Sequence, residues 1–343
     1  MKGIVFLGNR RCEVREVPVP EPGVGEIQIR VKATGICGSD LHVYRSTTAT
    51  DQVRGHEPCG VVEKVGPDVR RLKPGDRVSV HHHLGCGVCP MCARGETVAC
   101  PDDRCVGVSV PGSFAEFTVA AERNCILLPD AVSFTDGAFM ACVGTTAYAA
   151  LRRLEVTAHE SLAVFGLGPV GLSCVLVAKA LGLRVVGMDG VPERLELALA
   201  CGADEVVDGR AADPVAALQA FSRVPGIDWI NGVDHLIETS GSAPARRCML
   251  PAIRRGGKIA IVGVGSDEVI LNPSHIHGKA ATLIGSVVFP LGWSWEFVRF
   301  LATSGMSFEP AVTHRFALDD AQEALRIADE ARGGKVVFLP NGE

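Results

Sequence analysis

The stretch that decides the fold is Ser161-Leu-Ala-Val-Phe-Gly-Leu-Gly-Pro-Val-Gly171. Its first five residues are typical of a buried strand, and its last six residues fit the pattern G-x-G-x-x-G. This pattern alone is weak, because the chain contains 39 glycines. Its context strengthens it, since an apolar helix is predicted over 170–181 and the next predicted strand, 184–189, ends in the carboxylate of Asp189. Together these features predict a dinucleotide-binding βαβ unit.

Each residue of this turn has a physical task in such a unit. Gly166 permits the tight turn, Gly168 lets the backbone approach a pyrophosphate, and Gly171 lets helix and strand pack closely. Pro169 and Val170 begin the helix, whose free N–H groups then face the phosphates. The alternative is a tight turn that binds no nucleotide, and the strand, helix and carboxylate around it make that the weaker interpretation.

Asp189 favours NAD over NADP as the nucleotide. Its carboxylate would accept hydrogen bonds from the adenosine ribose hydroxyls and would repel a 2′-phosphate. Arg194 is the contrary observation, because a nearby arginine can hold that phosphate. We expect Arg194, on a helix predicted over 192–200, to contact the ribose or the solvent instead.

Strands and helices alternate outward from this stretch, which predicts an α/β fold with a doubly wound parallel sheet. The chain has 343 residues, enough for two domains. We assign residues 144–289 to the sheet domain, and residues 1–143 together with 290–343 to the other domain. The predicted strands of the sheet are 161–165, 184–189, 205–207, 235–239, 258–262 and 282–288.

The region before the sheet domain is predicted to consist of short strands and turns. Ile27-Gln-Ile-Arg-Val31 alternates apolar and polar residues, as a half-buried strand does. Pro74-Gly-Asp76 is a turn signal ahead of a strand over 77–80, and further strands are predicted over 60–65 and 113–119. We therefore expect a compact region resembling a β-barrel, with long functional loops.

Composition excludes several classes of function. Charged residues make up 21% of the chain, the formal net charge is −5, and no basic block indicates a nucleic-acid partner. No segment approaches the roughly 20 apolar residues that cross a bilayer. The apolar run 4–7 is too short for a signal peptide, so we expect a cytoplasmic protein.

Four of the 13 cysteines have the spacing of a closed metal site: Cys86, Cys89, Cys92 and Cys100. Such short loops fold readily around a tetrahedral zinc ion, and four thiolates leave it no open position. We therefore predict a structural zinc that holds together a lobe over 84–105. Disulfides are the alternative disfavoured by a reducing compartment, and a [4Fe–4S] cluster is a second alternative with the same ligands.

A second set of ligands is dispersed along the chain. Cys37 lies in Gly35-Ile-Cys-Gly-Ser-Asp-Leu-His42, His56 lies in Gly55-His-Glu57, and Cys142 lies near the predicted domain boundary. Two cysteines and one histidine with an open fourth position form a catalytic zinc arrangement. Taken singly, each residue has an ordinary structural explanation.

The chain resembles the zinc-containing medium-chain alcohol and polyol dehydrogenase family over nearly its full length. The matching stretches occur in the family's order: 35–42, 55–57, the four-cysteine lobe, Cys142-Val-Gly-Thr-Thr146 and Gly166-Leu-Gly-Pro-Val-Gly171. The resemblance implies a catalytic domain with a GroES-like β-barrel core, completed by the C-terminal tail. It also implies an inserted Rossmann domain, an active site in the cleft between the domains, and a homodimer or homotetramer paired through 283–289.

The resemblance assigns roles residue by residue. Cys37, His56 and Cys142 would ligate the catalytic zinc, with Glu57 as an intermittent ligand and Asp40 fixing the tautomer of His56. The remaining residues implied are Ser39 and His42 for proton relay, Thr146 against the nicotinamide, and Val262, Gly263 and Val264 bordering that ring. The zinc would act as a Lewis acid on an alcohol, which would lose its proton and pass a hydride to NAD.

Two departures leave the substrate open. Gly38 stands where liver-type enzymes have an arginine, whereas Cys142 stands where polyol and threonine dehydrogenases usually have a glutamate. His82 of the run 81–83, Tyr44 and Trp293 are our candidates for contacts with an alcohol or ketone substrate. A threonine 3-dehydrogenase, a non-catalytic NAD-binding redox sensor and iron in place of zinc remain alternatives.

Overall fold

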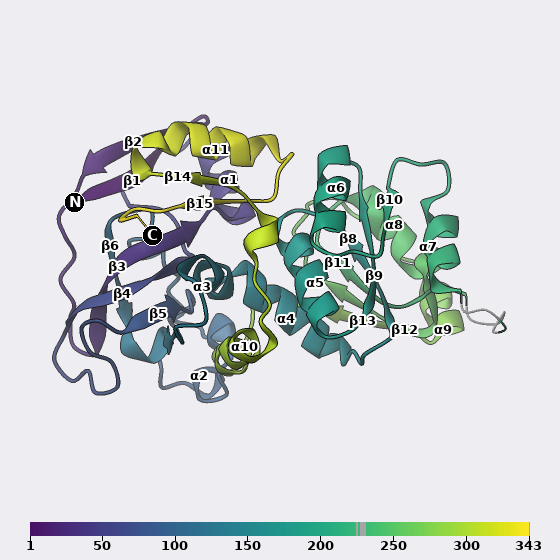
Figure 1. Cartoon of the computed structure of the whole chain (residues 1–343), viewed down its shortest axis with the longest axis horizontal. Coiled ribbons are helices and arrows are strands. Elements are labelled where there is room, and N and C mark those ends of the chain that lie inside the picture. The colour runs from purple at the N-terminus through teal and green to yellow at the C-terminus, as the bar shows by residue number, and fades with distance from the viewer. Residues whose placement is uncertain (224–225, 227–230, 270, 343) are drawn as a thin grey trace. The chain divides into compact units, whose positions relative to one another are not determined.

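The computed structural model describes residues 1–223, 226, 231–269 and 271–342. The chain forms two compact units, described here separately (Figure 1). The first unit comprises Met1–Thr145, Val288–Ala331 and Lys335–Glu343. The second unit comprises Thr146–Val287 and Arg332–Gly334. Among the described residues, no helix has the length and apolar character needed to cross a bilayer.

The second unit contains the predicted doubly wound sheet. In its described part, the six strands are ordered β10-β9-β8-β11-β12-β13 and all pair in parallel. The order steps outward in both directions from β8, which directly precedes the Gly-rich turn, and this confirms the predicted fold class. The strands are β8 (Ser161–Phe165), β9 (Arg184–Asp189), β10 (Glu205–Asp208), β11 (Val233–Glu238), β12 (Ile253–Ile261) and β13 (Thr282–Gly285).

The helices of the second unit begin where the sequence supplies a start signal. Among the described residues, four of them begin with a proline, whose fixed φ suits a first helical turn. Apolar side chains of the strands and helices then meet in one buried core. The helices are α4 (Val143–Leu154), which starts in the first unit, α5 (Pro169–Ala180), α6 (Pro192–Ala200), α7 (Pro214–Ser222), α8 (Ala243–Ala252) and α9 (Pro273–Lys279).

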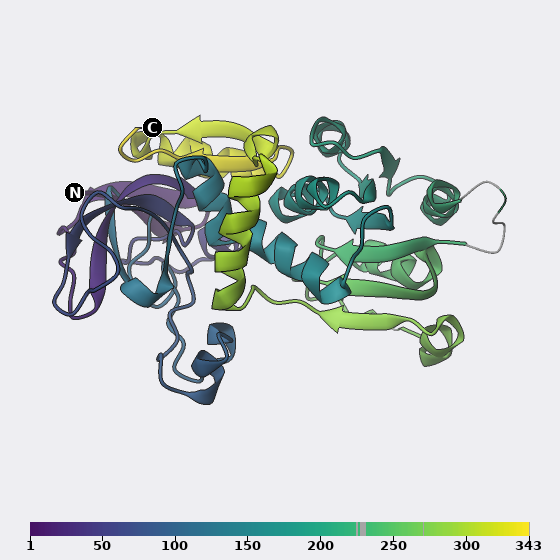
Figure 2. The ribbon, with the colours of Figure 1, turned by 60° about the horizontal axis from the view of Figure 1, so that its bottom comes forward.

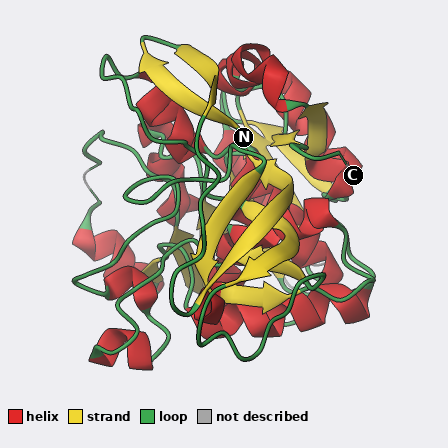
Figure 3. Ribbon diagram, turned by 90° about the vertical axis from the view of Figure 1, so that its left-hand side faces the viewer, coloured by secondary structure: helices red, strands yellow, loops and turns green. Residues whose placement is uncertain are grey.

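The first unit is built on a mostly antiparallel sheet. Its described strands are ordered β14-β15-β3-β4-β5-β7, β6 also pairs with β3, and β1 and β2 form a separate hairpin. Figure 3 shows these strands joined by long loops. The strands are β1 (Lys2–Gly8), β2 (Arg11–Glu16), β3 (Glu26–Gly35), β4 (Pro58–Val65), β5 (Arg77–Val80), β6 (Phe117–Ala121), β7 (Cys125–Leu127), β14 (Val312–Phe316) and β15 (Lys335–Phe338).

The tail returns to the first unit and closes its core. Strand β15 pairs antiparallel with β3, and β14 pairs in parallel with β15. Helix α11 (Ala321–Glu330) contributes Ala324 and Leu325 to a core that also contains Ile4 and Phe6. Helix α10 (Leu291–Ser304) belongs to this unit as well, and Figure 2 shows the segment with α2 (Pro90–Ala93) projecting from its strands.

Two expectations about elements were wrong. The first unit contains helices α1 (Gly38–Arg45) and α3 (Phe134–Ala141), although only strands were expected before residue 140. Helix α3 begins with Ser133, whose side chain accepts a hydrogen bond from Asp136 N–H, a cap that the sequence search overlooked. Strand β13 ends at Gly285, well before residue 288.

Candidate metal and cofactor sites

The four-cysteine cluster, Cys86, Cys89, Cys92 and Cys100, gathers its sulfurs around one point. All four Sγ atoms lie within 4.8 Å of one another. Backbone N–H groups point at the sulfurs, with Cys89 N–H donating to Cys86 Sγ at 3.3 Å and Cys92 N–H donating to Cys89 Sγ at 3.4 Å. The short loops therefore supply both the ligands and their hydrogen-bond donors.

Electrostatics favour a thiolate in this cluster. The N–H groups of Val88 and Cys89 lower the pKa of Cys86 to about 7. All 13 cysteines lie within the described residues, and none forms a disulfide. Four convergent sulfurs fit a tetrahedral ion.

The dispersed cluster, Cys37, His56, Glu57 and Cys142, also converges. One ligand atom from each residue lies within 4.8 Å of the others, and His56 Nε2 is 3.6 Å from Cys142 Sγ. Cys37 immediately precedes α1, His56 and Glu57 precede β4, and Cys142 ends α3. Three segments that are far apart in sequence thus meet inside the first unit.

Asp40 sets the orientation of two members of this cluster. Its Oδ2 accepts a hydrogen bond from Cys37 N–H at 2.9 Å, and its Oδ1 lies 3.3 Å from His56 Nδ1. The His56 proton then belongs on Nδ1, which leaves Nε2 facing Cys142 as a lone-pair donor. Burial would lower the pKa of His56, but the charges of Asp40 and Cys37 raise it well above its ordinary value.

The contact between the two thiols of the dispersed cluster shifts their pKa values in opposite directions. Hydrogen bonding to Cys142 lowers the pKa of Cys37 well below its ordinary value. The same contact raises the pKa of Cys142. A buried thiolate next to an imidazole is a donor set suited to a divalent cation.

Lys335 is a site residue that the sequence search missed. Its Nζ donates to Glu57 Oε1 at 2.6 Å, and both side chains are 0% exposed. Burial would lower the pKa of Lys335, but Glu57, Cys37 and Cys142 together raise it. Burial also raises the pKa of Glu57 to about 7, with Lys335 opposing that rise. The sequence offered only a lysine at the start of an apolar strand, which gives no signal of this pairing.

One atom of this cluster lacks a partner in the described part of the chain. Glu57 Oε2 is buried and accepts no hydrogen bond. A β-carbon at Gly35 would lie 2.2 Å from that oxygen, so only glycine fits beside it. Buried polar atoms are normally satisfied, and an unpaired carboxylate oxygen among two thiols and an imidazole fits a bound zinc ion.

The predicted proton-relay residues are exposed, whereas one predicted substrate contact is buried. Ser39 and His42 are exposed on α1, three positions apart and therefore on one helix face. Tyr44, in contrast, is 1% exposed in the core, and its hydroxyl accepts a hydrogen bond from Gln322 Nε2 at 2.7 Å. The assignment of Tyr44 to substrate binding is thus corrected, because its polar end is already used inside the protein. Trp293 lies half-buried in the first turn of α10.

The three histidines of the run have different surroundings. His81 stacks on Phe289 at 4.8 Å between ring centroids, and its Nε2 is 2.9 Å from Thr97 Oγ1. His82 is buried with its ring centroid 5.1 Å from that of His56, so it borders the dispersed cluster. Burial and the neighbouring His56 lower the pKa of His82 well below its ordinary value.

The Gly-rich turn has the geometry of a phosphate cradle. Gly166 adopts a φ of 87°, and a β-carbon at Gly171 would lie 1.9 Å from the carbonyl oxygen of Gly166. Helix α5 begins directly after Gly168, and no side chain of the described residues caps its N-terminus. The backbone N–H groups of the residues that follow Pro169 are therefore available to an anion.

Asp189 and Arg194 lie beside this turn. Asp189 ends β9, and its Oδ2 accepts a hydrogen bond from Leu167 N–H at 2.7 Å. Arg194 Nη1 is 3.6 Å from the same carboxylate oxygen. Val262 to Val264 directly follow β12, at the carboxyl edge of the sheet, and Thr146 lies in α4 as the first residue of the second unit. These residues fit a dinucleotide along that edge.

The sequence matches two described families. Residues 23–130 match the family described as "Alcohol dehydrogenase GroES-like domain". Residues 169–302 match the family described as "Zinc-binding dehydrogenase". The first match lies in the first unit and supports its GroES-like fold, and the second match covers most of the parallel sheet.

Curated relatives align over nearly the whole chain. A zinc-type alcohol dehydrogenase-like protein of Escherichia coli K12, YphC, is 36% identical over 347 residues, and the alignment covers 96% of each chain. An L-threonine 3-dehydrogenase of an Anaeromyxobacter species is 34% identical over 349 residues, covering 98% of this chain and 99% of the relative.

Solved structures agree with these matches. Alcohol dehydrogenase TADH from Thermus sp. ATN1 superposes with a TM-score of 0.91 at 29% identity over 99% of both chains. A short chain alcohol dehydrogenase of Escherichia coli CFT073 complexed with NADH gives 0.88 at 26% identity over 99% of both chains. A zinc-binding dehydrogenase of Sinorhizobium meliloti bound to NADP also gives 0.88, at 27% identity over 99% of both chains.

Proposed function

The chain belongs to the zinc-dependent alcohol dehydrogenase family, and we propose that it oxidises a secondary alcohol or polyol to the ketone with NAD as hydride acceptor. The observation that carries this proposal is the convergence of Cys37, His56 and Cys142, with Glu57, around one point. Two thiols and one imidazole leave a fourth position for substrate. A protein that only binds nucleotide has no use for that position.

In this proposal Cys37, His56 and Cys142 hold the catalytic zinc, which as a Lewis acid makes the alcohol oxygen more acidic. Asp40 keeps the His56 proton on Nδ1. Lys335 holds one oxygen of Glu57, which leaves the other oxygen directed at the cluster.

Ser39 and His42 move the substrate proton in this scheme. The Ser39 hydroxyl accepts the proton from the alcohol as it gives its own proton to His42, on the same exposed face of α1, and His42 releases a proton to solvent. A short relay of this kind is general base catalysis, which typically contributes 100-fold to 10,000-fold to a rate. The nicotinamide accepts the hydride when the coenzyme is bound.

NAD is the proposed coenzyme because Asp189 ends β9 beside the Gly-rich turn. Its carboxylate suits ribose hydroxyls and repels a 2′-phosphate. Arg194, which is 3.6 Å from Asp189, partly offsets that charge. An Asp189→Ala variant is therefore expected to lose NAD preference, whereas Asp208→Ala, at the end of the neighbouring β10, serves as the matched control.

L-Threonine is the second candidate substrate. Its support is the 34% identity to an L-threonine 3-dehydrogenase over 98% of this chain. L-Threonine is itself a secondary alcohol, so the same metal chemistry would serve both substrates. The assignment therefore depends on the side chains around the alcohol, of which His82 and Trp293 are our candidates.

A substrate panel tests the proposal directly. Zinc-loaded protein is assayed with NAD and with NADP against primary alcohols, secondary alcohols, polyols and L-threonine, with Cys142→Ser as the inactive control. We expect NAD reduction with secondary alcohols or polyols. Preference for L-threonine would select the second candidate, and binding of NAD without hydride transfer from any of the alcohols would favour a redox sensor.

Self-association through β13 is a further part of the proposal. In the described part of the sheet, β13 is an edge strand paired only with β12. An exposed strand edge is a ready surface for a second copy of the same strand. Light scattering on the purified chain, with Leu283→Pro as the disrupting variant, is expected to show a dimer or tetramer that the variant dissociates.

A further inference from the structure

His82, His83 and Cys105 form a third cluster of ligand atoms, separate from the four-cysteine and dispersed clusters. One ring nitrogen of each histidine and Sγ of Cys105 lie within 4.8 Å of one another. Ligand atoms around a tetrahedral zinc ion are about 3.5 Å apart. Small side-chain rotations would therefore bring all three to bonding distance of one ion.

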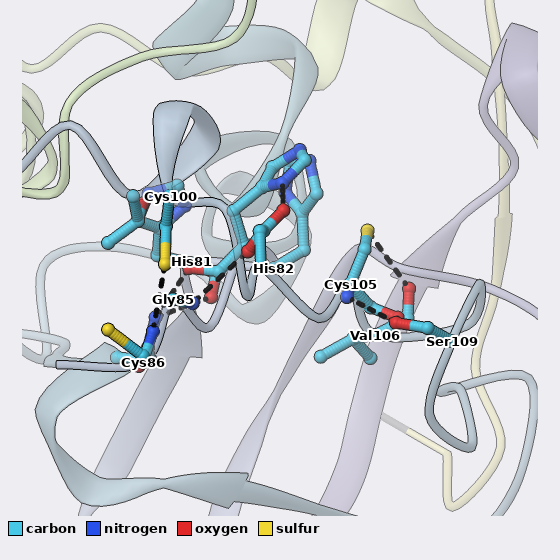
Figure 4. A network of polar contacts seen from close by, with 12 residues as sticks. His81, His82, Gly85, Cys86, Cys100, Cys105, Val106 and Ser109 are labelled. Atoms are coloured by element: carbon cyan, nitrogen blue, oxygen red, sulfur yellow. Dashed lines mark hydrogen bonds and ion pairs between the residues drawn. The ribbon is translucent and has the colours of Figure 1, made fainter. Parts of the chain in front are cut away.

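The backbone holds these residues on two paired segments. His83 and Cys105 form an antiparallel bridge, Val106 N–H donates to the carbonyl of His82 at 3.0 Å, and Leu84 N–H donates to the carbonyl of Arg104 at 2.8 Å. Figure 4 shows Cys86, Cys100 and Gly85 beside His81 and His82, with Cys105, Val106 and Ser109 as a separate group of contacts. The relative positions of the three side chains are thus set by main-chain hydrogen bonds.

Both histidines present a free ring nitrogen because the other nitrogen is bonded to an acceptor. His82 Nδ1 lies 2.8 Å from the carbonyl oxygen of Ala141, which can only accept, so Nδ1 carries the proton. His83 Nδ1 lies 2.5 Å from Asp103 Oδ2, and Asp103 is itself held by Gly85 N–H at 3.1 Å. Metal-binding histidines are oriented in this way, by a carbonyl or a carboxylate behind the ring.

We propose that His82, His83 and Cys105 bind a third zinc ion with an open fourth position. Two imidazoles and one thiolate suit zinc and do not suit magnesium or calcium, which take oxygen ligands. Asp103 and a Cys105 thiolate supply two negative charges next to the ion. The Cys105 thiol has only a weak contact to replace, 3.5 Å from its Sγ to the carbonyl oxygen of Val106.

The competing interpretation is that these side chains only border the dispersed cluster, since the ring centroids of His82 and His56 are 5.1 Å apart. Counting metal ions separates the two interpretations without reference to activity. Its outcome is also independent of the proposed dehydrogenase reaction, because that reaction needs no third ion.

The full-length chain is stripped of metal under reducing conditions and titrated with Zn²⁺ against a chromophoric chelator. We expect three equivalents for the native chain and two for Cys105→Ser or His83→Gln. Cys248→Ser is the matched control, because this half-buried cysteine belongs to none of the three clusters, and it should retain three. Two equivalents in the native chain, or three in both Cys105→Ser and His83→Gln, would overturn the proposal.

A second measurement keeps the proposal testable where the variants fail to fold. Crystals of the native chain grown with Zn²⁺ are measured at the zinc absorption edge. An anomalous peak among His82, His83 and Cys105 supports the third site. Peaks at the other two clusters with none at this position would refute it.

Discussion

The four-cysteine cluster and the dispersed cluster lie in the same unit but are assembled by different means. Cys86 to Cys100 come from one short stretch of loops, and their sulfurs accept hydrogen bonds from the backbone of that stretch. The dispersed cluster collects residues that precede α1, precede β4 and end α3. One cluster therefore forms locally, whereas the other requires the folded unit.

The electrostatic environments of the two clusters also differ. The four-cysteine cluster is mostly half-buried, and its thiols rely on N–H dipoles. The dispersed cluster is buried and contains a complete set of charged partners, Asp40 behind His56 and Lys335 behind Glu57. A metal in the first cluster stabilises the chain around it, while the chain around the second cluster is already organised to position a metal. The following predictions test that distinction.

Removing a dispersed ligand should produce the largest effect, and on activity. Cys142→Ser is expected to lower kcat/KM by about 1,000-fold or more, because Lewis-acid stabilisation is worth several kcal/mol. The melting temperature of the same variant should change little, in contrast to its kcat/KM. Loss of rate matched by an equal loss of folded protein would contradict the distinction.

Removing a four-cysteine ligand should act mainly on stability. Cys89→Ser is expected to release one zinc ion and to destabilise the first unit by about 4 kcal/mol or more, because loss of a bound metal is among the mechanisms that give the largest effects of single substitutions. Metal analysis and calorimetry provide the measurements. The comparison would break down if the variant kept its melting temperature and lost only its catalytic rate.

Breaking the buried ion pair should destabilise without removing a ligand. Lys335→Met leaves Glu57 uncompensated and is expected to cost about 3 kcal/mol, because an unpaired buried charge is expensive. The double variant Lys335→Met with Glu57→Gln should recover much of this loss in urea unfolding. Additive losses in the double variant would show that the two side chains do not act as a pair.

Asp234, a carboxylate outside both clusters, serves as a control whose substitution should change only stability. Asp234 accepts hydrogen bonds from Ser161 Oγ at 2.6 Å and Arg254 Nε at 2.6 Å. Asp234→Asn is expected to cost about 1.5 kcal/mol, the lower range for a charge-assisted hydrogen bond, with no change in zinc content. Asp208→Asn removes an ion pair with exposed Arg210 and should change neither quantity.

The effect of Asp234→Asn on stability should depend on pH, and the sign of that dependence can be predicted. Burial alone would raise the pKa of Asp234, but its bonds to Ser161 and Arg254 lower it. The folded state therefore favours the carboxylate, and this stabilisation is complete above the unfolded pKa of about 4 and is lost as pH falls through the lower folded value. The difference in stability between native chain and Asp234→Asn should be constant from pH 8 to 5 and shrink below about pH 4. A difference that grows on acidification would reverse the assignment.

Local patterns predicted most of the second unit and the four-cysteine cluster. Strand order and the turn at Gly166 follow from alternating strands and helices, and the Cys86–Cys100 spacing is a signal contained in one stretch. The members of the dispersed cluster could be proposed only by resemblance, because no periodicity relates residue 37 to residue 142. Helix α1 was missed since its eight residues carry little apolar pattern.

The burial and the partners of Lys335 and Tyr44 could not be predicted from the sequence. The lysine is buried and the tyrosine hydroxyl is bonded to Gln322, and both facts depend on contacts made after folding. The partner of Lys335 is 278 positions away along the chain, and that of Tyr44 is likewise 278 positions away. Pairings at that distance leave no trace in composition or local spacing.

The Lys335–Glu57 pair has a consequence for synthesis on the ribosome. Glu57 emerges early in translation, while β15, which carries its counter-charge, emerges after the second unit has been made. Until then the nascent first unit contains an acid that it cannot bury without a partner. A chain released before residue 335 would therefore lack both the counter-charge of Glu57 and the strand that pairs with β3.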